Sequence, residues 1–170
     1  LPSDRTEIMI KPKVIDHATW CRNIDHAFRD EEIELDEIPN LHVKPDLDAQ
    51  DIILDATVIC GMNSTTILEA AIAGKPIVVP MFSEMRQPEQ QEGIKFADTL
   101  EYLDVADDPE HFILLIERRL EDPVVPVGTM AGRTRMFAKY VSNPEGGAVQ
   151  RHVDLFERLI TEAKKNCAET

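Results

Sequence analysis

Positive charge, aromatic side chains and cysteine are all scarce in this 170-residue sequence. Lys and Arg total 18 against 32 Asp and Glu, so the formal net charge is −14. A protein that binds duplex nucleic acid needs a basic face to displace counterions, so this balance argues against a nucleic-acid partner. The same balance argues against docking on an anionic lipid surface.

The few cysteines and the lack of a long apolar run argue against a disulfide-rich secreted protein and against a membrane-spanning protein. Cys21, Cys60 and Cys167 are an odd number at wide spacing, which fits neither a disulfide framework nor a zinc site. No apolar run approaches the ~20 residues that span a bilayer, and no signal peptide is recognisable. These observations predict a protein of the reducing cytoplasm. The sequence begins Leu1-Pro2-Ser3 without an initiator Met, and we expect it to be a piece of a longer protein.

Apolar segments with the features of strands alternate with segments of helical periodicity along the whole chain. The expected strands cover residues 6–10, 41–43, 57–60, 76–80 and 100–105. The expected helices cover residues 17–28, 46–55, 64–73, 108–120, 133–140 and 148–165, with Thr19 as a candidate N-cap of the first. Because the strands are apolar throughout, the pattern predicts a mostly parallel sheet covered on both faces. The expected fold is a single doubly wound, three-layer Rossmann-like α/β domain over residues 1–170.

The last expected helix carries an apolar stripe, which predicts a buried face. This stripe consists of Val149, Val153, Phe156, Leu159, Ile160 and Ala163. The acidic stretch 30–37 is expected to be a solvated loop, with multidentate metal binding as the alternative. Asp46-Leu47-Asp48 has the spacing of a metal-binding Asp-x-Asp motif but precedes an expected helix, so we interpret it as helix capping.

The segment 57–80, TVICGMNSTTILEAAIAGKPIVVP, carries the most chemical information. It predicts a strand, a turn at Gly61, a helix beginning with hydroxyl-rich residues, and a second strand. In an open parallel sheet, ligands bind beyond the carboxyl ends of the strands. Asn63, Ser64, Thr65 and Thr66 there offer backbone N–H groups and hydroxyls at a helix N-terminus, which suit a phosphate or diphosphate. One turn further, Glu69 is able to accept hydrogen bonds from a sugar diol.

A purely structural interpretation of the same residues stays open. Thr66-x-x-Glu69 also matches a capping box, in which Thr66 caps the helix and Glu69 reaches back. The sequence contains neither G-x-G-x-x-G nor G-x-x-x-x-G-K-[ST], so neither the dinucleotide fingerprint nor the P-loop applies. Glu84 and Arg86 follow the strand 76–80, where a loop at the top of the sheet would meet the sugar of a donor.

The run GMNSTTILEAAIAGKPIVVP resembles the donor-binding C-terminal domain of GT-B type glycosyltransferases. It also resembles the CDP-glycerol glycerophosphotransferases and the proteins of capsule or surface polysaccharide synthesis. Two flanking pieces agree, because IMIKPK resembles a family strand ending in Lys-Pro-His and NPEGGAVQRHVDLF resembles the opening of the family's late helix. The resemblance implies a metal-independent transferase without a cofactor that takes a group from a nucleotide-diphosphate donor to a glycan or lipid-linked acceptor.

Carried onto this sequence, the resemblance assigns roles to individual residues. It implies that Ser64, Thr65 and Thr66 hold the donor diphosphate and that Glu69 holds the ribose hydroxyls. Gly61 would let the backbone approach the donor, and Lys11 or Lys13 would face the cleft. Lys13 stands where the family has His, which leaves the role of that His in doubt. Gly61 stands where retaining enzymes often have a second Glu, which points away from that subgroup.

The resemblance also implies what the 170 residues lack. A GT-B enzyme has an N-terminal domain that contacts the acceptor and often supplies the catalytic base, so we expect the isolated chain to transfer nothing. In a full-length protein it would be peripheral to a membrane at most. Glycerophosphate transfer, an enzyme like UDP-N-acetylglucosamine 2-epimerase, and a non-catalytic nucleotide-binding module are the alternatives.

Overall fold

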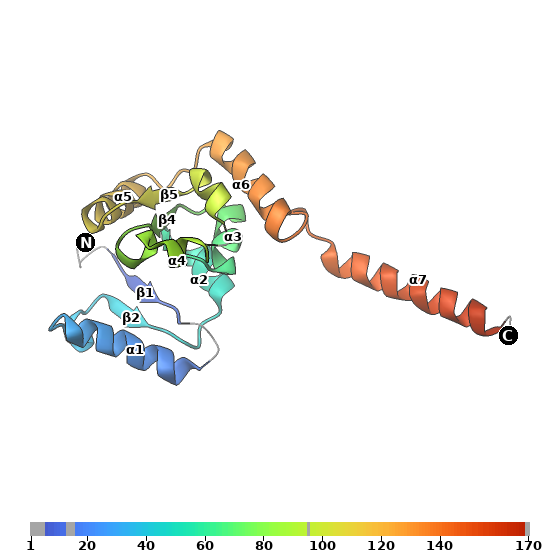
Figure 1. Ribbon diagram of the computed structural model, residues 1–170, viewed down its shortest axis with the longest axis horizontal. Helices are drawn as coiled ribbons and strands as arrows, with labels where there is room; N and C mark the ends of the chain where they lie inside the picture. The colour runs from blue at the N-terminus through green and yellow to red at the C-terminus, as the bar shows by residue number, and fades with distance from the viewer. Residues whose placement is uncertain (1–5, 13–15, 95, 169–170) are drawn as a thin grey trace.

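The computed structural model of the chain describes residues 6–12, 16–94 and 96–168. Within these residues, five short strands alternate with helices (Figure 1). The strands are β1 (Ile8–Ile10), β2 (Leu41–Val43), β3 (Ile59–Cys60), β4 (Ile77–Pro80) and β5 (Asp104–Ala106). The α-helices are α1 (His17–Asp30), α2 (Ala49–Asp55), α3 (Thr65–Ile72), α4 (Pro88–Gln91), α5 (Pro109–Glu121), α6 (Val127–Tyr140) and α7 (Ala148–Ala168), and the 3₁₀ turns are η1 (Leu35–Glu37), η2 (Ser83–Arg86) and η3 (Ala97–Tyr102). The chain is an α/β protein, as predicted.

The strands form two parallel sheets in the described part of the chain, where the sequence predicted one. β1 pairs with β2, and the second sheet has the order β3-β4-β5. Every one of these pairings is parallel, with Ile8 opposite Leu41 and Ile59 opposite Ile77. The expected parallel pairing is therefore confirmed, while the expectation of a single continuous sheet is not.

The central strand β4 is covered on both faces, which gives the second sheet three layers. Ile77 and Val79 point into a core formed with α3 and α6, while Val78 packs on the other side with Ile116 of α5. Successive side chains of a strand point to opposite faces, so an uninterrupted apolar run is what a doubly covered strand requires. All three side chains are buried.

Helix α6 begins at Val127, six residues before the start at residue 133 that the sequence predicts. Two contacts of its first half explain this. The Arg133 guanidinium is buried and donates to the carbonyl oxygens of Lys75 (2.6 Å) and Tyr102 (2.9 Å). Gly132 lies against the Tyr102 ring, so closely that a Cβ at this position would be 2.3 Å from ring carbons. Tertiary packing thus outweighs the low helix propensity of two glycines.

The segment 97–105 also differs from the prediction. Residues 97–102 form η3, and the strand follows only at Asp104–Ala106. The apolar residues of η3 pack on the core around α3 and α6 instead of joining the sheet. At the chain's first helix, Asp16 is the N-cap and its carboxylate accepts from the Thr19 N–H, so the prediction of Thr19 as cap is wrong.

Helix α7 does not bury the apolar stripe that the sequence predicts. It extends away from the body of the molecule, and every side chain from 148 to 165 is exposed (Figure 1). Phe156, for example, is 61% exposed. The periodicity correctly predicted the helix, but none of the described residues covers its apolar face. The acidic stretch 30–37 is exposed apart from Leu35, which agrees with the solvated interpretation.

None of the helices in the described ranges combines the length and the apolar character needed to cross a membrane.

Candidate functional site

A sharp turn connects β3 to α3. The Gly61 N–H donates to the Val78 carbonyl oxygen (3.3 Å), which continues the β3–β4 pairing to the end of the strand. Asn63 has a φ of 51°, in the left-handed region that Asn tolerates better than most residues. Its side-chain amide donates to the Gly93 carbonyl oxygen (2.8 Å) and so ties the turn to the segment after α4. A Cβ on Gly61 would meet nothing within 4 Å, so the space above this residue is open.

Ser64 is the N-cap of α3. Its Oγ accepts from the Thr66 N–H (3.3 Å) and lies 3.1 Å from the Thr66 hydroxyl, to which it donates. The Ile67 N–H bonds back to the Ser64 carbonyl oxygen (3.0 Å). The alternative interpretation of Thr66 and Glu69 as a capping box is therefore wrong, because the N-cap is two residues earlier, at Ser64. The half-buried Glu69 is not needed at the helix start and lies on the second turn of α3.

Glu69 reaches a depression of about 510 Å³ beyond the carboxyl ends of β1 and β2. The depression is lined by Lys11, Pro45, Asp46, Leu47, Asp48, Ala49, Gln50 and Glu69. Lys11 follows β1 directly, and residues 45–50 connect β2 to the first turn of α2. The structure therefore brings together Lys11 and Glu69, which lie 58 positions apart in the sequence. Gly61, Asn63, Ser64, Thr65 and Thr66 do not line this depression and lie where β3 leads into α3.

Lys11 holds the ends of β1 and β2 together. Its ammonium donates to the carbonyl oxygens of Pro12 (3.1 Å) and Pro45 (2.9 Å). An ammonium group has three donors, and the described residues accept from two of them, which leaves one N–H for a ligand. The sequence predicted that Lys11 or Lys13 would face the cleft; Lys11 does line the depression, and Lys13 lies outside the described residues.

The walls of the depression carry more negative than positive charge. Among the described lining residues, three carry a carboxylate (Asp46, Asp48 and Glu69) and one, Lys11, carries an ammonium group. Asp48 caps α2 by accepting from the Gln50 N–H (2.7 Å), which confirms the capping interpretation for this residue. Carboxylates accept hydrogen bonds from hydroxyl groups and repel bare phosphate, so the depression is suited to a hydroxyl-rich group. Over the described ranges, no group of three or more His, Cys, Asp or Glu residues could hold a metal ion.

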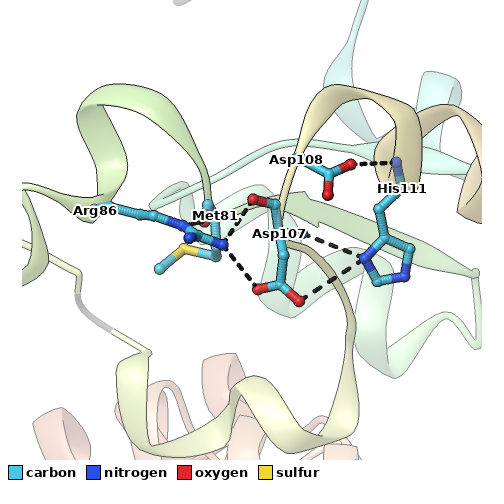
Figure 2. A network of polar contacts seen from close by, with 5 residues as sticks. All are labelled: Met81, Arg86, Asp107, Asp108 and His111. Carbon is cyan, nitrogen blue, oxygen red and sulfur yellow. Dashed lines mark hydrogen bonds and ion pairs between the residues drawn. The ribbon is translucent and has the colours of Figure 1, made fainter.

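A polar network lies at the carboxyl ends of β4 and β5 (Figure 2). Arg86 donates to the Met81 carbonyl oxygen (3.2 Å) and to the carbonyl oxygen of Asp107 (2.7 Å), and it approaches the Asp107 carboxylate at 3.4 Å. The His111 Nδ1 accepts from the Asp107 N–H (3.4 Å), and Asp108 caps α5. Arg86 was predicted to meet a donor sugar, and in the structure it ties η2 to the end of β5. Only its position after a strand was readable from the sequence; Asp107 and His111 had no distinguishing motif.

No family model, curated protein or solved structure matches this chain. The family resemblance of the segment 57–80 therefore stays a prediction.

Proposed function

We propose that the chain is the donor-binding domain of a glycosyltransferase, in which a nucleotide-diphosphate donor binds at the carboxyl ends of the strands. The finer fold assignment, one Rossmann-like half of a GT-B enzyme, belongs to this proposal. The observation that carries it is the depression where Lys11 and Glu69 meet. Ligands of open parallel α/β sheets bind in the crevice outside the carboxyl ends of the strands, at the point where the strand order reverses.

The depression and the start of α3 suit different parts of the donor. The acidic depression suits the ribose, whose two hydroxyls donate to the Glu69 carboxylate. The start of α3, with the N–H and hydroxyl of Thr65 and the hydroxyls of Ser64 and Thr66, suits the diphosphate. At a helix N-terminus, backbone donors and the positive end of the helix dipole favour an anion.

The proposed reaction moves a glycosyl group from the donor to an acceptor hydroxyl. The C–O bond to the diphosphate breaks, and negative charge accumulates on the departing phosphate oxygens. Fixed donors at the α3 start would stabilise that charge without a metal ion. The acceptor and the base that takes its proton are assigned to a further domain, so the 170-residue chain binds donor without turnover. Glycerophosphate transfer would use the same diphosphate contacts.

Binding of UDP, CDP, GDP and their sugar-linked forms by isothermal titration calorimetry tests the proposal. At least one should bind with a millimolar or lower Kd. Loss of a hydrogen bond to a charged group costs about 1.5–3 kcal/mol, so Glu69→Gln should weaken binding about 10- to 100-fold. Glu121→Gln, on exposed α5 surface, is the matched control and should leave the Kd unchanged.

The ribose contact is isolated by repeating the titrations with the 2′,3′-dideoxy form of the nucleotide that binds best. This ligand lacks the diol, so wild type and Glu69→Gln should bind it equally. If Glu69→Gln weakened the binding of both ligands equally, Glu69 would not act through the ribose diol. No affinity for any of the nucleotides in folded protein would overturn the proposed function.

A further inference from the structure

The β1 strand has one edge whose backbone groups are turned away from its partner. In a parallel pair, every second residue of a strand directs its N–H and C=O toward the neighbour. The Ile8 N–H donates to the Asn40 carbonyl oxygen (2.7 Å), and the Ile10 carbonyl oxygen accepts from the Lys44 N–H (2.9 Å). The backbone groups of Ile8 and Ile10 therefore hydrogen-bond to β2 and the residues that flank it, and the N–H and C=O of Met9 point to the opposite edge.

The β3 strand has a matching open edge. The Ile59 N–H donates to the Pro76 carbonyl oxygen (2.9 Å), and the Gly61 N–H donates to the Val78 carbonyl oxygen (3.3 Å). These two residues serve β4, so the N–H and C=O of Cys60 point away from it. Among the described residues, no backbone hydrogen bond beyond those within the two sheets involves Met9 or Cys60. Each sheet therefore ends in a short open edge, the kind of edge that proteins normally cover.

The two sheets are oriented so that one strand could serve both edges. Lys11 after β1 and Glu69 on the helix after β3 line the same depression, so the carboxyl ends of β1 and β3 lie on the same side. β1 is the strand of its sheet that lies toward the second sheet (Figure 1). In the second sheet, β3 is an edge strand with β4 on its other side.

We propose that one further strand, parallel to β1 and β3, inserts between them and joins the two sheets into one. The order would become β2-β1-new-β3-β4-β5, which is the doubly wound order 3-2-1-4-5-6 with the new strand as the first. Neighbouring strands are about 4.8 Å apart, so the new strand would hydrogen-bond to Met9 on one side and Cys60 on the other. This inference rests on the doubly wound interpretation of the fold and does not depend on donor binding.

The source of the strand follows from its place in that order. A first strand precedes β1 in the chain and reaches it through a crossover of a dozen or more residues. A strand in this place therefore lies more than about a dozen residues before Ile8, and we assign it to a segment of the same polypeptide outside residues 1–170.

Burial along the strands agrees with an unfilled position beside β1 and β3. Strands of a parallel sheet are normally covered on both faces. Val78 and Val79 of β4 meet this condition, while Met9 is 43% exposed and Cys60 is also exposed. A strand between β1 and β3 would bring apolar side chains against both. Its carboxyl end would also reach the depression beside Lys11 and Glu69 and complete the floor of that site.

Amide hydrogen exchange, measured on the 170-residue chain and on the polypeptide extended by the upstream residues of its gene, tests this inference. In the 170-residue chain, Met9 and Cys60 should exchange near the free-peptide rate, while Ile8 and Ile59 are protected. In the extended protein, Met9 and Cys60 should slow by at least 100-fold. A gene without upstream residues, or unchanged exchange in the extended protein, would overturn the inference. So would protection of Met9 that rises with the concentration of the 170-residue chain, since a second copy would then fill the edge.

A proline substitution gives an independent test. Met9→Pro removes an N–H that faces the new strand and leaves the β1–β2 hydrogen bonds intact, as proline on an edge strand does. In the 170-residue chain, Met9→Pro and its control Met9→Ala should melt at the same temperature. In the extended protein, only Met9→Pro should return the Cys60 amide to fast exchange. Identical exchange of Cys60 in the two extended variants would contradict the insertion. Nucleotide binding is not a readout of either test, so failure of this inference and failure of the proposed function are separable.

Discussion

Replacing Arg133 with methionine should destabilise the protein more than most single changes. The Arg133 side chain is 1% exposed, and its guanidinium is the donor for the Lys75 and Tyr102 carbonyl oxygens. Methionine fills much of the volume and offers no donor, so both carbonyls lose their partner. Arg133 thereby connects α6 to Lys75, two residues before β4, and to Tyr102, the last residue of η3.

The expected loss follows from two opposing contributions. A buried carbonyl left without a donor costs about 1–3 kcal/mol, so two cost about 2–6 kcal/mol. Burial of the guanidinium is itself unfavourable, and the desolvation lowers the pKa of Arg133 to about 10. Removing this charge offsets part of the loss, which leaves about 3 kcal/mol as the expected drop in unfolding free energy.

Urea unfolding followed by circular dichroism measures this drop. With a urea dependence of about 2 kcal/mol per M, the midpoint should fall by about 1.5 M. Arg135→Met on the exposed side of the same helix is the matched control, and its loss should stay below about 1 kcal/mol, the size of its cation–π contact with Tyr102. A loss below about 1 kcal/mol for Arg133→Met would mean that the two hydrogen bonds of Arg133 do not stabilise the fold as proposed.

Three further predictions concern other parts of the fold. Gly132→Ala should cost about 1–3 kcal/mol in unfolding free energy because the added methyl would collide with the Tyr102 ring, whereas Gly128→Ala, with open space at its Cβ, should be neutral or slightly stabilising; equal urea midpoints would contradict this. The hydrogen bond from Lys139 is the main cause that lowers the pKa of Asp98, so this carboxylate stabilises the fold above its unfolded pKa and the contribution is lost as the pH falls through the lowered pKa. The stability difference between wild type and Asp98→Asn should therefore be full above about pH 5 and shrink below about pH 4, and a difference that does not change with pH would be the contrary result. Removal of α7 should leave the melting temperature of the remaining chain within about 2 °C, because its side chains are exposed; a larger fall would mean that α7 packs on the body.

The segments predicted well are those whose own residues contain clear signals for a strand, a turn or a helix cap. The segment 57–80 contains a strand, its turn, a capped helix ending before Gly74 and a second strand, and the structure has each of these in that order. The strand at 41–43 was correct to the residue. In these segments, apolar runs, caps and glycines decide the conformation locally.

Features that depend on distant contacts were missed. The early start of α6 depends on contacts of Gly132 and Arg133 with Tyr102 of η3. Arg133 and Tyr102 are 31 positions apart in the sequence. The exposure of the α7 stripe depends on what lies beside the helix, which periodicity alone does not reveal. The resemblance named both Lys11 and Glu69, but it did not predict that they line the same depression. That depends on how β1, β2, α2 and α3 pack together, which the sequence alone does not reveal.

Backbone and side-chain chemical shifts, recorded by NMR while a nucleoside diphosphate is added, test the site most directly. The shift changes should be largest at Lys11, Glu69 and Ser64–Thr66, and the Arg86–Asp107–His111 network should show none. Saturable shift changes confined to any other surface, or none at millimolar ligand, would contradict the claim that this depression and the α3 start hold a nucleotide donor.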